Sequence, residues 1–160
     1  SFTHGMHYKT LHLSNLFGRY DNFGNKAHMI PAIIARLHQA KVSGLPSVGI
    51  WGDGTAKRSF IFANDVATFI GSVLSDFEAF PQDYLLEGAS SYTVYEYNKM
   101  IASVVGYQGD FELDLAKPVG NKKRNLASKH KGLYKIEYMP IKESINIVYN
   151  YFLKKRLYEK

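Results

Sequence analysis

The most constraining feature of this sequence is residues 28–62, where helical spacing of apolar side chains gives way to two short strand-like runs. The first part repeats apolar residues at intervals of three and four, which predicts an amphipathic helix over residues 28–41: Met29, Ile30, Ile33, Ile34 and Leu37. Residues 47–51 and 58–62 then favour strands, joined by a tight Gly-Asp-Gly-Thr turn at 52–55. We expect a hairpin or an adjacent strand pair there.

The remaining chain continues this alternation of strands and helices. Strands are expected at 10–16, 84–86 and 111–115, and helices at about 65–80, 94–105 and 141–153. Asn64 or Asp65 is the expected cap of the second helix, and Thr93 with Glu96 forms a capping-box pattern before the third, which Gly106 ends. Residues 117–135 are basic and irregular. This order predicts a mixed α/β fold.

Composition narrows the possible functions. The chain has 160 residues, of which 46% are hydrophobic, and it contains no apolar run of the ~18 residues that a membrane span requires. The absence of cysteine excludes disulfides, thiolate nucleophiles and Cys-ligated zinc within the chain. A net charge of +6 suits phosphate-bearing partners, which leaves nucleic acids and nucleotides both open. The acidic residues are explained by turns, caps and solvent-facing strand positions, so we expect no metal site.

Three ordered segments carry a specific resemblance. They read Asn-Leu-Phe-Gly-Arg-Tyr-Asp-Asn-Phe at 15–23, His-Met-Ile-Pro-Ala at 28–32 and Trp-Gly-Asp-Gly-Thr-Ala-Lys-Arg-Ser-Phe-Ile-Phe-Ala-Asn-Asp-Val-Ala at 51–67. This series resembles the extended short-chain dehydrogenases/reductases, the NAD-dependent epimerase/dehydratase family, and within them the GDP-L-fucose synthase group. The resemblance continues through 102–107 and 117–120 and covers essentially the whole chain.

The resemblance implies that residues 1–160 are the C-terminal, substrate-binding portion of such an enzyme. Residues 1–24 and about 59–80 would contribute the edge of an otherwise missing Rossmann domain, and the rest a small mixed α/β substrate-binding domain. Neither G-x-G-x-x-G nor G-x-x-x-x-G-K-[ST] occurs in the chain, so the Gly-rich turn for NADP would lie in the missing half.

His28 is the strongest candidate for direct chemistry. Removal of a proton next to a ketone and its return on the other face need acid/base groups that titrate near neutral pH, as an imidazole does. By resemblance, His28 is the family's acid/base histidine and approaches the nicotinamide end of NADP. The strand end formed by Leu13, Ser14, Asn15 and Leu16 is implied to line the same cofactor. From the residues alone, a surface helix cap and an ordinary strand end remain open.

The second group of candidates would hold the substrate. Arg36 and Arg58 can each present a planar fork to a diphosphate, and Trp51 can offer a flat face or an indole N–H. By resemblance these three are substrate-binding residues, and Lys117 contacts the nucleotide. The polar side of a helix, a strand-edge charge and core packing are the respective alternatives. The family pattern is close to Lys-Pro-Asp-Gly, and Val119 replaces its acidic residue here.

The implied activity is that of an NADP-dependent nucleotide-sugar epimerase-reductase, acting at C3, C5 and the C4 ketone of GDP-4-keto-6-deoxymannose. Val119 keeps open a reductase or epimerase of another GDP-sugar, such as a heptose, and a non-catalytic nucleotide-sugar binding fragment is a further alternative. A nucleic-acid-binding protein would require a contiguous basic and aromatic face. We expect a GDP-sugar partner, no nucleic acid or membrane partner, a cytoplasmic location and a homodimeric intact enzyme.

Overall fold

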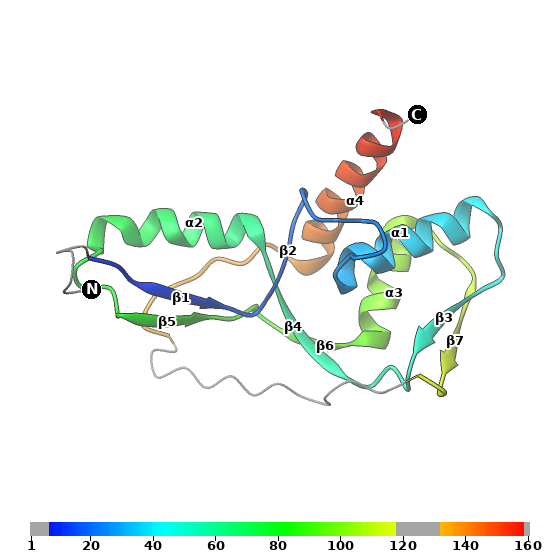
Figure 1. Cartoon of the computed structure of the whole chain (residues 1–160), viewed down its shortest axis with the longest axis horizontal. Helices are drawn as coiled ribbons and strands as arrows, with labels where there is room; N and C mark the ends of the chain where they lie inside the picture. Colours follow the sequence, from blue (N-terminus) through cyan, green and yellow to red (C-terminus); the bar gives the residue numbers. More distant parts are fainter. Residues whose placement is uncertain (1–6, 118–131, 159–160) are drawn as a thin grey trace.

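The computed structural model describes residues 7–117 and 132–158, and it confirms the mixed α/β class (Figure 1). Its helices are α1 (Met29–Val42), α2 (Ala63–Val73), which runs into a short 3₁₀ turn (Leu74–Asp76), α3 (Val94–Val105) and α4 (Ile141–Tyr158). Its strands are β1 (Thr10–Leu13), β2 (Asn15–Phe17), β3 (Ser47–Trp51), β4 (Lys57–Phe62), β5 (Asp83–Leu86), β6 (Ser91–Thr93) and β7 (Asp110–Asp114). None of the helices within these ranges has the length and apolarity needed to traverse a bilayer.

The strands form three small sheets, and most of their pairings are parallel. β1 pairs with β5, β2 with β4 and β3 with β7, all in parallel, whereas β6 joins β4 in antiparallel. The single strand expected at 10–16 is therefore two strands. Ser14 donates its backbone N–H to the Leu86 carbonyl at the end of β5, and Asn15 then begins a new pairing with Phe60. The chain changes partner at this point.

The hairpin or adjacent pair expected from 47–62 is wrong. The turn itself is as expected, because Gly52 and Gly54 have φ values of 73° and 71°. The strands on either side diverge into different sheets, since β3 pairs with β7 over Ser47↔Asp110 to Trp51↔Asp114. A turn motif depends on local backbone geometry. Strand pairing depends instead on which face of each strand is buried in the tertiary fold.

The helix boundaries follow the sequence signals closely in two cases. α1 begins at Met29 and carries Pro31 in its first turn, where no intrahelical N–H is needed. α3 has the expected capping box: the Thr93 hydroxyl accepts from the Glu96 N–H, the Glu96 carboxylate accepts from the Thr93 N–H, and Gly106 ends the helix at φ 75°.

The second helix departs from its expected bounds at both ends. α2 begins at Ala63 with Phe62 as its cap position, so neither Asn64 nor Asp65 caps it, and it ends at Val73 rather than near residue 80. Asp65 lies inside the first turn and accepts a hydrogen bond from the Met139 N–H at 3.2 Å instead. The last helix, α4, extends to Tyr158, beyond the expected Leu153.

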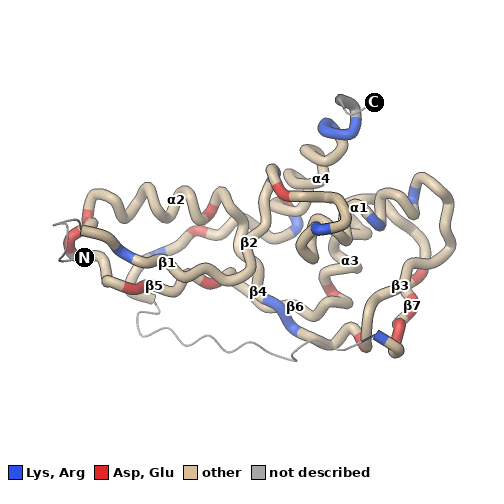
Figure 2. Tube along the Cα trace, in the orientation of Figure 1, with Lys and Arg blue, Asp and Glu red and all other residues tan. Residues whose placement is uncertain are grey.

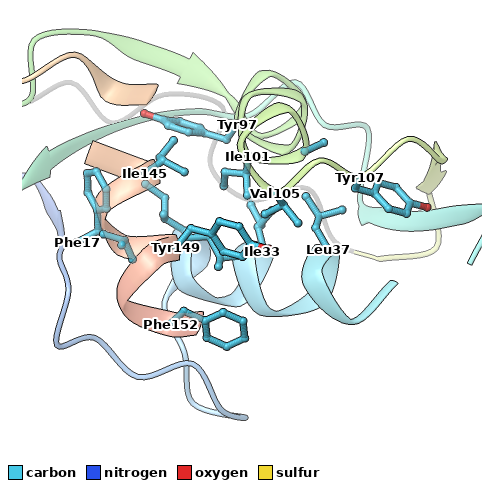
Figure 3. Packing of buried hydrophobic residues seen from close by; sticks show 14 of the residues in the cluster. Phe17, Ile33, Leu37, Tyr97, Ile101, Val105, Tyr107, Ile145, Tyr149 and Phe152 are labelled. Atoms are coloured by element: carbon cyan, nitrogen blue, oxygen red, sulfur yellow. The ribbon is translucent and has the colours of Figure 1, made fainter. Parts of the chain in front are cut away.

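The larger core, which we call the main core, lies between α1, α3 and α4 and the strands β2 and β4. Figure 3 shows side chains from the three helices directed at one another: Ile33 and Leu37 from α1, Ile101 and Val105 from α3, and Ile145, Tyr149 and Phe152 from α4. The Tyr97 ring packs edge-on against Phe60 of β4, with ring centroids 5.3 Å apart. These contacts fix α1 and α3 side by side, which positions the candidate substrate residues.

A smaller core lies at the other end of the molecule, under α2. Its buried side chains are Ile61, Val66, Phe69, Phe80, Tyr84 and Leu86, and Tyr134, Ile136 and Tyr138 from residues 132–140 pack against them. In Figure 1, α2 covers β1 and β5 on one side, and the segment 132–140 crosses beneath toward α4. β1 itself contains no buried residue. This end therefore holds a thin layer rather than a closed sheet.

Candidate functional site

His28 stands at the N-terminal end of α1, beside a cavity of about 370 Å³. The cavity is lined by His28 together with residues from the end of β2 and the start of α2, including Leu16, Arg19, Tyr20 and Asn64. The imidazole is exposed and has no hydrogen-bond partner within residues 7–117 and 132–158. It is therefore free to exchange a proton with a ligand in this cavity.

β2 and α2 approach each other closely at one wall of the cavity, which Gly18 and Ala63 both line. Gly18, the residue after β2, is buried, and a Cβ there would lie 2.9 Å from the Cβ of Ala63 at the start of α2. Only glycine allows this contact without displacement of α2. The end of a parallel strand is where open α/β folds bind ligands, so His28 and Leu16 occupy the appropriate edge.

The strand-end residues expected to line the cofactor divide into two pairs. Leu13 and Leu16 are exposed and can face a ligand. The side chains of Ser14 and Asn15 are instead used within the fold: the Ser14 hydroxyl accepts from the Gly88 N–H, and the Asn15 amide donates to the Ser59 carbonyl at 2.9 Å. Leu16 lines the cavity together with His28, whereas Leu13 does not, and no Gly-rich turn for the phosphates of a dinucleotide occurs in this chain.

Arg36 lies two turns further along α1 and is half-buried against α3. Its Nη2 donates to the Asn98 Oδ1 at 2.8 Å, and its Nε is buried without a hydrogen-bond partner in the described part of the chain. Burial lowers the pKa of Arg36, although a guanidinium remains protonated in proteins near neutral pH. The polar helix face considered for Arg36 is thus a buried helix–helix contact.

Arg58 is half-buried on β4 and is fixed mainly through its backbone. The Tyr97 hydroxyl donates to the Arg58 carbonyl at 3.2 Å, and burial raises the pKa of Tyr97, which keeps that hydroxyl protonated. The Arg58 Nη1 donates to the Lys57 carbonyl at 2.7 Å. Arg58 and Tyr92 are opposite each other in the β4–β6 register.

Trp51 and Lys117 are brought together at the edge of the β3–β7 sheet. Trp51 is opposite Asp114 in the register, and the Lys117 N–H donates to the Asp114 carbonyl at 3.1 Å. The Lys117 ammonium lies 5.8 Å from the centroid of the indole ring. Trp51 is 69% exposed, so core packing is not its role, and the pair presents a flat ring and a cation on the surface.

The predicted residues thus form local groups rather than one enclosed pocket. The cavity beside His28 is not lined by Arg36, Trp51 or Arg58. Val119 and most of the basic segment 117–135 lie outside the described residues. Elsewhere, Lys and Arg residues lie just before β1 and on β4, α1, α3 and α4 rather than in one stretch of the chain (Figure 2).

One residue of the site region was missed by sequence reasoning, namely Asn98. Asn98 is fully buried, and it occupies an inward position of α3 between Val94 and Ile101, where the helical period calls for an apolar residue. A polar residue at an apolar position of the helical pattern is the sequence signal that could have identified Asn98, because a fully buried amide requires a specific hydrogen-bond partner.

The parallel pairings, the crossover helices and the ligand-type residues at a strand edge define a protein of the Rossmann type. Comparison with known proteins specifies it further. The sequence profile described as "NAD dependent epimerase/dehydratase family" matches residues 2–86. The chain belongs to this family.

The similar proteins include synthases of GDP-sugars. The GDP-L-colitose synthase of Yersinia pseudotuberculosis is 43% identical over 73% of this chain and 38% of its own length. The GDP-L-fucose synthase of Azorhizobium caulinodans is 37% identical over 91% of this chain and 47% of its own. The chain thus spans less than half the length of these relatives.

Solved structures share the fold. A GDP-L-fucose synthetase of Naegleria fowleri bound to NADP aligns with a TM-score of 0.83 at 21% identity, over 93% of this chain and 47% of that one. The GDP-mannoheptose C4 reductase of Campylobacter jejuni, also with NADP bound, aligns with a TM-score of 0.76 at 21% identity, over 94% of this chain and 54% of that one.

Proposed function

We propose that this chain is the substrate-binding portion of an NADP-dependent nucleotide-sugar epimerase-reductase of the GDP-L-fucose synthase type. The reaction would be epimerisation at C3 and C5 and reduction of the C4 ketone of GDP-4-keto-6-deoxymannose. The observation that carries the proposal is the 37% identity to a GDP-L-fucose synthase over 91% of the chain. Residues 1–24 and about 59–80 would belong to the edge of the Rossmann domain, and the intact enzyme would be a cytoplasmic homodimer.

His28 is the proposed acid/base group. Its imidazole is exposed, lines the cavity of about 370 Å³ and has no competing hydrogen bond from the described residues. A carbon next to a ketone is acidic enough to lose a proton to such a base, and return of the proton from the opposite side inverts that carbon. His28 would exchange the proton on one face of that carbon, and a second acid/base group from the missing half of the enzyme would exchange it on the opposite face.

Arg36, Arg58, Trp51 and Lys117 are proposed to hold the nucleotide end of the substrate. Arg36 follows His28 by eight residues on α1, which places it about 12 Å further along the helix axis. A diphosphate-linked sugar extended along α1 would thus present its sugar to His28 and its diphosphate to Arg36. Arg58 would add a second guanidinium, and the exposed Trp51 ring would offer a stacking face.

NADP, when bound in the intact enzyme, would supply the hydride for the C4 ketone. On this chain, the exposed Leu13 and Leu16 side chains and His28 would border its nicotinamide end, and Ser14 and Asn15 would keep the strand end in place through their bonds to Gly88 and Ser59. The apolar leucines would exclude water from the reacting face.

A second candidate is the reaction for which the Yersinia relative is named. That GDP-L-colitose synthase is 43% identical over 118 residues. This identity is higher than that of the Azorhizobium relative, but it extends over a shorter alignment. Both candidates require the same recognition of a GDP group, and they differ in the sugar.

Calorimetric titration of the chain with GDP, UDP and guanosine tests the shared part of both candidates. We expect GDP to bind more tightly than guanosine, because the diphosphate gains charge-assisted hydrogen bonds, and more tightly than UDP. Arg36→Gln should weaken GDP binding by about tenfold or more and leave guanosine binding unchanged. Lys142→Gln removes an equal charge from the exposed start of α4 and serves as the matched control.

Equal affinity for GDP and guanosine, or tighter binding of a single-stranded oligonucleotide than of GDP, would overturn the proposal. GDP-L-fucose and GDP-L-colitose, titrated in parallel, separate the two candidates by which of them binds more tightly.

A further inference from the structure

Asn98 is the one fully buried amide among the described residues, and its orientation is determined by two hydrogen bonds. Its Nδ2 donates to the Val94 carbonyl one turn earlier in α3, at 2.8 Å. A carbonyl can only accept, so the amino end of the side chain must point there. The Oδ1 consequently points at α1, where it accepts from the Arg36 Nη2 at 2.8 Å.

Arg36 has a neutral partner where a half-buried guanidinium usually has a carboxylate. No ion pair within residues 7–117 and 132–158 involves Arg36, and its buried Nε has no acceptor there. Buried charges are normally paired, because desolvation without compensation is costly. The guanidinium is thus oriented by Asn98, and no carboxylate among the described residues neutralises its positive charge.

We infer that Asn98 is a positioning residue that directs Arg36 at the diphosphate of the GDP-sugar and preserves its charge for that ligand. The inference rests on the proposed function, in which Arg36 binds the diphosphate. An aspartate at position 98 would have nearly the same shape but would carry a negative charge beside the guanidinium. The resulting ion pair would compete directly with the phosphates.

The test compares Asn98→Asp and Asn98→Leu with the wild-type chain, using GDP and guanosine as probes. We expect Asn98→Asp to weaken GDP binding by about ten- to a hundredfold, the value of one lost charge-assisted bond, with guanosine binding unchanged. Its GDP affinity should also depend less on ionic strength, because one fewer free positive charge faces the phosphates. Asn98→Leu should give a smaller loss with the salt dependence retained, because Arg36 keeps its charge but loses its support.

Thermal unfolding of each variant establishes that it is folded, and Lys142→Gln is again the charge-matched control. A wild-type ratio of GDP to guanosine affinity in Asn98→Asp would overturn the inference, as would an equal loss of both ligands, which indicates a purely structural role. Should Asn98→Asp fail to fold, Asn98→Leu decides alone by the same ratio.

The proposed function fails in a different way. If Arg36→Gln leaves the ratio unchanged, Arg36 does not bind the diphosphate, and the inference about Asn98 falls with it. If Arg36→Gln lowers the ratio and the Asn98 variants do not, only the inference is lost.

Discussion

Asp65 is a buried carboxylate with no ion pair within the described ranges. It lies in the first turn of α2 and accepts the Met139 N–H, which connects α2 to the segment that leads into α4. Burial raises the pKa of Asp65, and the Met139 hydrogen bond opposes this rise. The same carboxylate therefore holds two elements together and incurs a desolvation cost when ionised.

Replacement of Asp65 separates these two effects. Asp65→Asn keeps an acceptor for Met139 without the charge, so its free energy of unfolding at pH 7 should equal or exceed that of the wild type. Asp65→Ala removes the acceptor and should lower the free energy of unfolding by about 1 kcal/mol or more. Urea unfolding measures both variants.

The sign of the pH dependence follows from the raised pKa. An acid whose pKa is raised by folding stabilises the fold below its unfolded pKa of 3.8, and this contribution is lost as the pH rises through the folded value. The advantage of Asp65→Asn over wild type should consequently grow between pH 3 and pH 7. An advantage that shrinks with rising pH would show that the ionised carboxylate is the stabilising form.

Some residue roles were open to prediction and others were not. Thr93 and Glu96 were assigned correctly because a capping box depends only on residues three apart. Asp65 has the same chemistry as a cap, but its partner Met139 is 74 residues away. Ser14 and Asn15 hydrogen-bond to backbone groups that are distant in the sequence, and their expected position at a cofactor stays a prediction. Local patterns cannot reveal such long-range partners.

At the scale of elements, the Thr93 cap gives a direct prediction for α3. Thr93→Ala removes the acceptor of the Glu96 N–H, now at 3.1 Å, and should lower the free energy of unfolding by about 1 kcal/mol. Thr93→Ser retains the hydroxyl and should stay close to wild type. Urea unfolding at pH 7 distinguishes them, and equal midpoints for the two variants would mean that the cap contributes nothing.

The Glu96 half of the box responds to acid. The Thr93 backbone N–H and hydroxyl lower the pKa of Glu96, so its stabilising effect is present above the unfolded pKa of 4.5 and is lost as the pH falls through the folded value. The free energy of unfolding of Glu96→Gln should therefore be lower than that of the wild type at pH 7, and the two values should converge in acid.

Element types were predictable, whereas strand partners were not. The apolar spacing identified α1 because periodicity reflects which face is buried, and the capping box with its terminal glycine identified α3. These local signals gave no information on which strands pair. β3 and β4 were expected together, yet β3 pairs with β7, about 60 residues away in the chain, and the three-residue β6 was not expected at all. Both outcomes depend on tertiary packing.

At the scale of the whole molecule, the two cores differ in size and closure. The main core contains buried side chains from three helices and from β2 and β4. The smaller core is bounded by α2, β5 and residues 134–138, and its sheet is the two-stranded β1–β5 pair. Two-stranded sheets are marginal alone in water. The chain also spans less than half the length of the relatives above, whose remaining half would adjoin this sheet under the proposed function.

Amide hydrogen exchange should therefore report two units of unequal stability. We expect amides of β1 and β5 to exchange faster than those of α1 and α3, because fewer apolar contacts must break to expose them. Leu86→Ala, which should cost about 2–5 kcal/mol locally, should accelerate exchange in β1 and β5 and leave α1 and α3 protected. Leu37→Ala truncates a leucine that is equally buried, but in the main core, and should accelerate exchange in α1 and α3. Leu86→Ala could instead raise the exchange rate uniformly over the described ranges. That outcome would mean that the two cores unfold as one cooperative unit. The β1–β5 layer would then be as stable as the helices even without further strands.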